Sequence, residues 1–561
     1  MAIVLPDGIL TNATLQYVRD FIMNNFKINA IVSIPQTAFS HYGAGVKCSL
    51  LFLTKSTKNK EDCDIFMAQA EYVGYDATGR EIEQNDLNEI FNNYKNFIEK
   101  KNFKLNDKCF LIKFNSIKSN KRIDAGFNKN PYNLVSKYSI VKLKDCILNK
   151  GTYGANEPSI PYNEGDIRYI RISDIDENGN LKNDTIKTAK NIDEKYILND
   201  NDFLFARTGS VGRTFLYKKS MGKSIYAGYL IKYILDTSKI YPEYLSAYCQ
   251  TSKYWQWVKQ QERPAVQSNI NAEEYSSLTI PLPPLDKQKE IANIMKDANL
   301  LKEKLEKEAD KLLNSIDEYL LRELGINLPK KETDLKNRIS YTVKLSEIKG
   351  NRFDCEYHQS IYNDYKKALI QGKYKLTKIK ELMDNIRIIL QPSDEKVLYI
   401  EIGDIDIENA IINLKVVPLK DLPNNSKIYI EKGDLLISKV RPNRKAIAIY
   451  NGEDKAYCTS AFVVLRENGK YKKELLQYLL RTNILNALIV RNVTGSTYPT
   501  INDMDILNIE IPTPPIEIQQ KIVNEINERK QKALRLQKEA KETLENAKSK
   551  IEEIIFKQFT L

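Results

Sequence analysis

Two stretches of the chain place apolar residues three and four positions apart, the pattern of a helix with one buried face. Each stretch follows a proline-rich boundary, which ends at Leu285 in the first case and at Ile516 in the second. Proline disfavours helix before it and is tolerated in the first turn after it, so each boundary predicts a helix start. The apolar positions are Ile291, Ile294, Ala298, Leu301, Leu305, Leu312 and Ile316, and Ile522, Ile526, Ala533, Leu536, Ala540, Ala547, Ile551 and Ile554. We therefore predict two long helices that pair along these stripes as an antiparallel coiled coil.

The segment ahead of each predicted helix has a different pattern. Short runs rich in Ile, Tyr, Val and Phe are broken by Gly, Asn and Asp turn residues. Such runs are typical of strands joined by tight turns, so each segment is predicted to be a mainly β domain with some helices.

The chain repeats this arrangement in the same order. YIRISDID returns as YIEIGDID, DFLFARTGSVGRTFLY as DLLISKVRPNRKAIAIY, and the glutamine after each proline boundary also recurs. The matched pairs are Tyr169 and Tyr399, Asp202 and Asp434, and Gln288 and Gln519. The second member of each pair follows the first at a nearly constant offset, which indicates two copies of one unit.

The charge of the chain favours a polyanionic partner. The formal net charge is +12 and the pI is near 8.9. Acidic and basic residues balance over residues 286–316 of the first helix, so the basic surplus lies in other segments. Nucleic acid is therefore a better candidate partner for the β domains than for the helices.

Cysteine, histidine and hydropathy patterns exclude several classes. The seven cysteines form no Cys-x-x-Cys pair, and the two histidines are too few for a histidine metal site, so no disulfide framework or metal site is expected. Free thiols fit a cytoplasmic protein. No apolar run approaches the roughly 18 residues of a membrane span, so no membrane association is expected.

The matched loops after Asp202 and Asp434 are the first candidates for DNA contact. Their glycines and cations suit close approach to phosphates and bidentate contact with guanine. The candidate residues are Arg207, Thr208, Ser210 and Arg213 in the first copy, and Lys439, Arg441, Arg444 and Lys445 in the second. The alternative is a pair of solvated hairpin turns with incidental charge, which the recurrence at equivalent places disfavours.

A second pair of loops precedes the proline boundaries. Its candidate DNA contacts are Gln267 and Ser268 in the first copy and Thr497 and Tyr498 in the second, because their side chains hydrogen-bond base edges or phosphates. Polar loops that only position the following strand explain these residues equally well.

No complete catalytic site is found in the sequence. The two Pro-Pro pairs lack the preceding Asn or Asp and the following aromatic residue that an amino-methyltransferase uses, and no Walker loop is present. The glycines around His41 imitate a cofactor loop only weakly, because no acidic residue closes a following strand. We predict no catalytic, metal-binding or cofactor-binding residue in this chain.

These segments resemble the specificity subunit of type I restriction-modification systems over residues 137 to 556. The resemblance rests on the duplicated β domains, the two proline boundaries with Gln288 and Gln519, and the two long helices. It implies that each β domain is a target-recognition domain for one half of a split double-stranded DNA target. It also implies partners: two methyltransferase subunits that use S-adenosylmethionine to methylate adenine N6, and ATP-dependent restriction subunits.

The segment 1–60 resembles the carboxy-terminal end of that adenine-N6 methyltransferase, from its fifth strand onward, and the segment from Met67 resembles its short extension. The family's cofactor loop and catalytic turn are not among these residues. Two interpretations follow: a specificity subunit with a methyltransferase remnant, or the downstream part of a fused methyltransferase and specificity enzyme. A purely structural coiled-coil protein is disfavoured by the duplicated β domains.

We therefore expect an α+β multidomain chain with an amino-terminal α/β, Rossmann-like methyltransferase fragment. The expected divisions are the fragment (1–60), its extension (61–136), target-recognition domain 1 (137–284), spacer helix 1 (285–324), a linker with a helix from Tyr357 to Ile370 (325–373), target-recognition domain 2 (374–513) and spacer helix 2 (514–556). A spacer helix of about 30 residues spans roughly 45 Å, which predicts half-sites about one turn of DNA apart.

Overall fold

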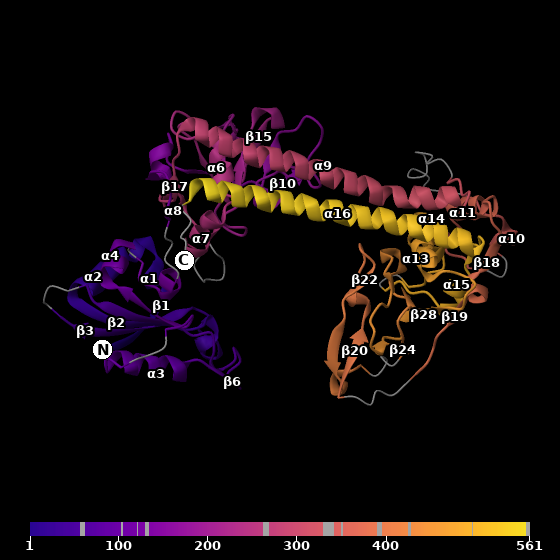
Figure 1. Cartoon of the computed structure of the whole chain (residues 1–561), viewed down its shortest axis with the longest axis horizontal. Coiled ribbons are helices and arrows are strands. Elements are labelled where there is room, and N and C mark those ends of the chain that lie inside the picture. Colours follow the sequence, from indigo (N-terminus) through magenta and orange to yellow (C-terminus); the bar gives the residue numbers. More distant parts are fainter. Residues whose placement is uncertain are drawn as a thin grey trace. The chain divides into compact units, whose positions relative to one another are not determined.

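The structure is a computed structural model of the chain (Figure 1). It describes residues 1–56, 62–101, 105–120, 122–129, 134–261, 269–328, 342–348, 352–389, 395–423, 428–495 and 498–556. The chain divides into two compact units: residues 1–301 with 542–561 form unit 1, and residues 302–541 form unit 2. Both units contain helices and strands, which confirms the mixed α and β architecture.

The amino-terminal part of unit 1 is a five-stranded sheet with helices on both faces (Figure 1). Its strand order is β1, β3, β2, β4 and β7, and only β2 and β4 are parallel. The strands are Ala2–Pro6 (β1), Phe26–Ser33 (β2), Cys48–Lys55 (β3), Asp64–Gln69 (β4) and Cys109–Lys113 (β7); the helices include Asp7–Thr11 (α1), Gln16–Asn25 (α2) and Leu87–Ile98 (α3). The boundary expected at residue 60 therefore falls inside one sheet.

The apolar run of β4 explains why both faces are covered. Successive strand residues point to opposite faces. Ile65 and Met67 pack in the core with α2, whereas Phe66 and Ala68 pack in the core with α3. A strand with no polar face must be buried on both sides.

The first β domain contains a four-stranded antiparallel sheet in the order β14, β13, β16, β9. Its strands and helices are Ile140–Lys142 (β8), Thr152–Tyr153 (β9), Ser159–Pro161 (β10), Arg168–Ile170 (β11), Lys187–Ala189 (β12), Phe203–Ala206 (β13), Thr214–Leu216 (β14), Ser224–Tyr226 (β15), Leu230–Tyr233 (β16), Pro242–Tyr248 (α6), Ser252–Gln261 (α7), Ala272–Ser276 (α8) and Thr279–Pro281 (β17). Helices α6 and α7 pack on this sheet through a core rich in tyrosine.

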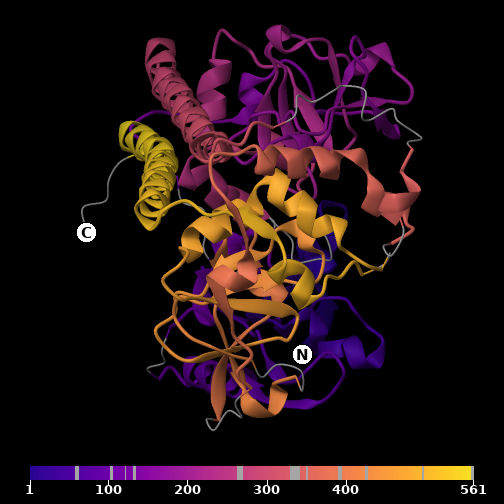
Figure 2. The same cartoon turned by 90° about the vertical axis from the view of Figure 1, so that its right-hand side faces the viewer.

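The second β domain, coloured orange to yellow in Figure 2, repeats this sheet in the order β26, β25, β28, β19. Its elements include Leu376–Lys378 (β18), Met383–Asn385 (β19), Lys396–Ile400 (β20), Lys415–Pro418 (β23), Ile428–Ile430 (β24), Leu435–Ser438 (β25), Ile447–Ile449 (β26), Ala456–Cys458 (β27), Phe462–Glu467 (β28), Lys473–Arg481 (α13), Asn483–Arg491 (α14), Asp503–Leu507 (α15) and Glu510–Pro512 (β29). The parallel pair of β11 with β15 likewise recurs as β20 with β27. The duplication read from the sequence is thus a duplication of structure.

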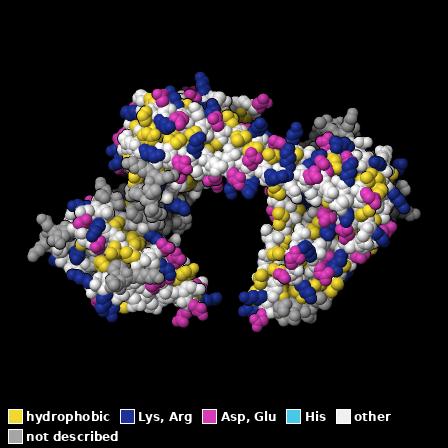
Figure 3. All heavy atoms as spheres, viewed as in Figure 1, with side chains coloured by type: hydrophobic (Ala, Val, Ile, Leu, Met, Phe, Trp, Pro, Cys, Tyr) yellow, Lys and Arg dark blue, Asp and Glu magenta, His cyan; other side chains and the backbone are white. Residues whose placement is uncertain are grey.

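Both long helices exceed the length of about 30 residues used above for the spacing estimate. Helix α9 spans Leu285–Glu323 and helix α16 spans Ile516–Ile555, 39 and 40 residues. Within unit 1, residues Ile291 and Met295 share a core with Leu544 and Ile551, and within unit 2 the Arg529 guanidinium donates to Ser315 Oγ at 2.9 Å. On the face shown in Figure 3, Lys and Arg side chains on the helices are interspersed with Asp and Glu. None of the described helices is both long and apolar enough to cross a membrane.

Most of the predicted seam is buried, with one clear exception. Ile291, Ala298, Leu305, Ile522, Ile526, Ala533, Ala540, Ala547 and Ile551 are all buried. Leu301 is 44% exposed, so its place in the seam was predicted wrongly. Ala309, which the prediction omitted, is buried instead, because it lies on the same helix face as Ile291, whereas Leu301 lies to one side of that face.

The glutamine after each proline boundary has a structural role. The Gln288 side chain accepts from the Tyr241 N–H at 2.7 Å and donates to the carbonyls of Lys239 and Pro283 at 3.0 and 2.8 Å. Gln519 repeats all three bonds in the second copy, with the Lys472 N–H at 2.8 Å and the carbonyls of Lys470 and Pro514 at 3.3 and 2.8 Å. Each glutamine therefore ties the start of its long helix to the loop ahead of α6 or α13.

We expect Gln519→Ala to lower the free energy of unfolding by about 2–4 kcal/mol, because the buried Gln519 side chain is lost and three backbone groups, one of them buried, lose their partner. The neighbouring Gln520 is exposed, and among the described residues its side chain bonds only to Asn524 on the same helix, so Gln520→Ala is the matched control, with a change within about 0.5 kcal/mol. Urea denaturation measures both. Equal effects of the two substitutions would contradict the assigned role.

Candidate DNA interface

The first predicted loop connects β13 to β14, and two buried tyrosines hold its backbone by hydrogen bonds. Gly209 and Gly212 adopt left-handed conformations with φ of 74° and 86°. The Gly212 N–H donates to the Tyr275 hydroxyl at 3.1 Å, and the Tyr254 hydroxyl donates to the Gly212 carbonyl at 2.8 Å. A Cβ at Gly212 would lie 2.7 Å from the Val258 side chain, so glycine is required there. Burial raises the pKa of the Tyr254 and Tyr275 hydroxyls, which stay neutral donors.

The second predicted loop connects β25 to β26 and makes its turn without glycine. Arg441 and Lys445 adopt left-handed conformations with φ of 50° and 57°. Arg441 occupies the position of Gly209 at the repeat offset, so a left-handed residue stands there without glycine, at a cost of about 1–2 kcal/mol. Asn486 of α14 donates to the Pro442 carbonyl at 3.0 Å and holds the turn.

In each copy the first predicted loop contacts residues that directly follow the second. In the first copy Thr208 forms a β-bridge with Asn269, and the Ile270 N–H donates to the Arg207 carbonyl at 2.9 Å. In the second copy Val440 forms the matching bridge with Thr500. The first loop and the residues around Asn269 or Thr500, which are far apart in sequence, thus form one edge in each copy, which we call the loop edge.

The second copy extends this edge with an aromatic contact. The Arg441 N–H donates to the Pro499 carbonyl at 2.8 Å, and the Arg441 guanidinium lies 5.3 Å from the ring centre of Tyr498. Tyr498 is 67% exposed. The candidates Gln267, Ser268 and Thr497 lie outside the described residues.

In the first copy the predicted residues differ in how free their side chains are to contact DNA. The Arg207 guanidinium lies over the Tyr153 ring at 4.8 Å, with Nε 3.5 Å from Asn269 Oδ1. Arg213 donates to the Ile175 carbonyl at 2.8 Å and is 3.8 Å from Glu177. Thr208 is buried and Ser210 half-buried. Arg213 is thus engaged within its own domain, and Arg207 is the better placed cation.

In the second copy two of the four predicted cations are engaged internally. Lys439 Nζ lies 2.8 Å from Asp503, whose pKa burial alone would raise but hydrogen bonds from Arg387 and Lys439 hold below its usual range. Lys445 donates to Asn483 Oδ1 at 2.8 Å. Burial lowers the pKa of Lys445, although the Asp317 carboxylate opposes that shift.

Arg444 is the most available of the predicted cations. It is exposed, and among the described residues no hydrogen bond or ion pair holds its side chain. Together with Arg441 and Tyr498 it makes the most accessible group of contact residues on the second loop edge.

Sequence reasoning missed residues that the fold carries to these edges. Glu177, Asn178 and Trp255 line a pocket with Gly209, Ser210 and Arg213 in the first copy. Arg387, from the segment after β19, forms an ion pair with Asp503 and lines a pocket with Lys439 in the second. None of these residues stands near a predicted loop in sequence, so no local pattern pointed to them.

Comparisons with known proteins agree with the duplicated architecture. A family model described as "Type I restriction modification DNA specificity domain" matches residues 135–316 and 395–546, and one described as "N-6 DNA Methylase" matches residues 1–140. The specificity subunit of type I restriction enzyme MjaVIII from Methanocaldococcus jannaschii is 24% identical over 386 residues, 65% of this chain and 80% of that one. The HindI specificity subunit of Haemophilus influenzae is 29% identical over 132 residues, and the chain spans only 28% of its length.

Solved structures include the type I restriction-modification S subunit from M. genitalium. It is 14% identical, and the alignment covers 77% of this chain and 99% of that one with a TM-score of 0.40.

Proposed function

Because the chain belongs to the family of type I restriction-modification DNA specificity proteins, we propose that it reads a split double-stranded DNA target, one half with each β domain. The observation that carries this proposal is the pair of loop edges. They stand at equivalent places on two copies of one sheet but differ in their side chains. A shared framework with unlike contact residues suits two copies that read different half-sites.

The two long helices suit a spacer between the half-sites, paired as an antiparallel coiled coil. Buried residues recur every seven positions at Ile291, Ala298 and Leu305, and again at Ile526, Ala533, Ala540 and Ala547. A seven-residue repeat is the coiled-coil period. Lys532 of α16 also lies 3.1 Å from Glu308 of α9.

The amino-terminal domain fits a fragment of an adenine-N6 methyltransferase with a Rossmann-like fold. Its first strand, following helices and next two strands occur in the order that the resemblance implies. This chain supplies no Asn-Pro-Pro-aromatic turn. We therefore assign methyl transfer to partner methyltransferase subunits that use S-adenosylmethionine, and cleavage to ATP-dependent restriction subunits, both acting on double-stranded DNA in the cytoplasm.

A second candidate function is the downstream part of a fused methyltransferase and specificity enzyme. The match of residues 1–140 to the N-6 DNA Methylase family favours it. The genomic sequence ahead of the codon for Met1 separates the two candidates, because an in-frame Asn-Pro-Pro-aromatic turn there supports the enzyme.

We expect the purified chain with S-adenosylmethionine to transfer no methyl groups, and the chain co-expressed with a methyltransferase subunit to direct methylation. The test is a map of methylated adenines in a host that lacks other adenine methyltransferases. The expected motif has two specified halves around an unspecified gap. A continuous motif, or methylation that does not depend on this chain, would contradict the proposal.

A further inference from the structure

A bidentate arginine–aspartate pair stands ahead of each β domain. Arg122 Nε and Nη2 donate to the two Asp124 carboxylate oxygens at 2.9 and 3.0 Å. Arg352 Nε and Nη2 donate to Asp354 in the same way, at 2.7 and 2.8 Å. The separation of the two pairs along the chain equals that of Tyr169 from Tyr399, so they stand at equivalent positions of the repeat. The first pair is buried, with both side chains less than a tenth exposed.

The residues that follow each pair are also equivalent. The Arg122 guanidinium lies 4.4 Å from the ring centre of Phe127, and the Arg352 guanidinium lies 5.2 Å from that of Tyr357. One residue further, Asn128 Nδ2 donates to the Arg122 carbonyl at 3.2 Å. His358 Nε2 lies 2.5 Å from the Arg352 carbonyl. The segments Arg122–Asn128 and Arg352–His358 therefore form one local structure, present twice.

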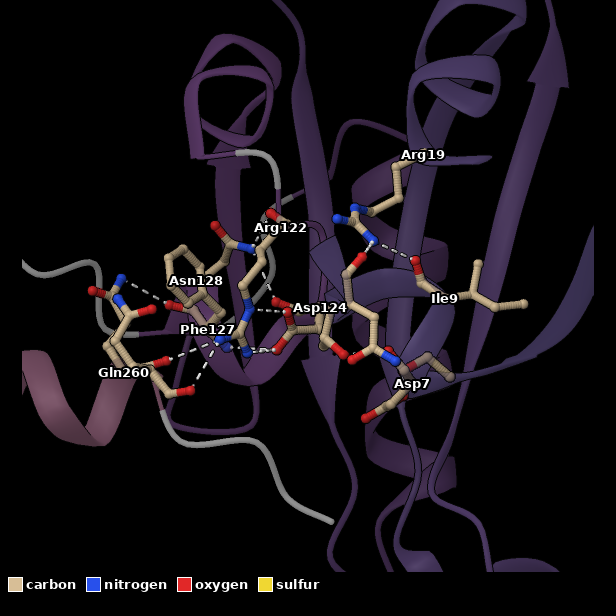
Figure 4. Close-up of polar contacts among 12 residues, drawn as sticks. Asp7, Ile9, Arg19, Arg122, Asp124, Phe127, Asn128 and Gln260 are labelled. Atoms are coloured by element: carbon tan, nitrogen blue, oxygen red, sulfur yellow. Dashed lines mark hydrogen bonds and ion pairs between the residues drawn. The ribbon is translucent and has the colours of Figure 1, made fainter. Parts of the chain in front are cut away.

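Both segments grip the end of a helix. In the first copy Arg122 Nη1 donates to the carbonyls of Gln260 and Gln261 at the end of α7, at 3.5 and 3.3 Å, and Gln260 Nε2 donates back to the Phe127 carbonyl at 3.2 Å (Figure 4). The carbonyls at a helix end lack partners within the helix and carry partial negative charge, so a guanidinium is well suited to them.

The second copy repeats this reciprocal contact. Arg352 Nη1 donates to the Val493 carbonyl at 2.8 Å, just after α14 ends, and Arg491 Nε donates back to the Tyr357 carbonyl at 2.9 Å. Gln260 and Arg491 are separated along the chain by the same interval as Gln288 and Gln519. Two different side chains thus make the same bond at the same place in the repeat.

The gripped backbone in the second copy leads directly to the loop edge. Thr494, next to Val493, exchanges two backbone hydrogen bonds with Thr500 at 2.8 and 2.9 Å. Thr500 in turn forms the bridge with Val440, the neighbour of Arg441. An unbroken chain of short contacts therefore runs from Arg352 to the cation that we assign to DNA.

We propose that Arg122–Asn128 and Arg352–His358 are a duplicated clamp, in which each copy positions the loop edge of its own β domain for reading its own half-site. The inference rests on the proposed function. It also moves the start of the first specificity copy back to Arg122, into the segment that the sequence assigned to the methyltransferase extension. Arg122 and Arg352 are positioning residues, because they act through the helix ends.

The test replaces Arg352 in the full-length chain. Arg352→Gln should lower discrimination at one half-site by about tenfold or more, with less than about twofold change at the other, and Arg122→Gln should show the reverse. Binding to duplexes with either half-site scrambled measures both. Tyr357→Phe and Arg491→Gln install the residues that the first copy uses, and should keep discrimination.

A second measurement, amide hydrogen exchange, tests the clamp without DNA. Hydrogen exchange at the amides of Thr494 and Thr500 should quicken in Arg352→Gln and stay unchanged in Tyr357→Phe. Arg352→Lys, which keeps the charge but not the fork of donors, should give the same result if the glutamine variant fails to fold. Faster exchange with discrimination intact at both half-sites would overturn the positioning role. Unchanged exchange would overturn the clamp itself. If the unmodified chain binds DNA without sequence preference, the proposed function itself is wrong. The positioning role of the clamp is then wrong as well.

Discussion

Replacing Arg441 and Arg444 together with glutamine should reduce discrimination at one half-site by about 100-fold or more and leave the other half-site unchanged. A base-contacting arginine is worth about 1–3 kcal/mol of discrimination, and both cations belong to one turn, on which Arg444 is exposed and Arg441 half-buried. Competition binding with duplexes scrambled in either half measures the effect. If the two arginines contact phosphate instead, affinity for all sequences falls alike and the salt dependence weakens.

Two controls separate contact from folding. Arg441→Gly relieves the left-handed strain at φ of 50° while removing the cation, so it should lower discrimination without lowering the free energy of unfolding. Arg207→Gln in the first copy should affect the opposite half-site. Effects of both copies on the same half, or on neither, would show that the loops are ordinary turns.

The sequence predicted the duplication because whole segments recur, and it predicted both helices because apolar spacing and proline boundaries act locally. The side-by-side arrangement of the loops in each copy was not predicted. Thr208 meets Asn269 only because the sheet and α7 fold back between them. Local patterns carry no information about which two loops share an edge.

The sequence did not predict the clamp, for a different reason. Its two copies share only an arginine and an aspartate at fixed spacing, followed by Phe127 in one and Tyr357 in the other. Each falls in a stretch that the sequence assigned to an extension or to a linker. Only the matching contacts to the ends of α7 and α14 reveal the equivalence. Similarly, Lys439 and Lys445 look like free cations in sequence, but their partners Asp503 and Asn483 come from elsewhere in the chain.

Lengthening both long helices by four residues should lengthen the unread gap of the target by one or two base pairs. Four residues add about 6 Å of helix, and a base pair rises about 3.4 Å. Four residues also rotate a helix by about 40° beyond one full turn, which is close to the rotation between neighbouring base pairs in DNA. A coiled coil tolerates such an insertion by local unwinding. The insertions belong after Leu301 in α9 and after Lys541 in α16, where each helix passes from one unit to the other.

The gap is measured by mapping methylated adenines in cells that carry the lengthened chain and a methyltransferase subunit. Insertion in α16 alone is the matched control, because it moves Leu544 and Ile551 out of register with Ile291 and Met295 while contacts such as Lys532 with Glu308 stay in register, and it should reduce stability without a new gap. Both half-site sequences should persist in the doubly lengthened chain, since the loop edges are untouched. A gap that ignores helix length would show that the helices only join the two β domains and do not set their spacing.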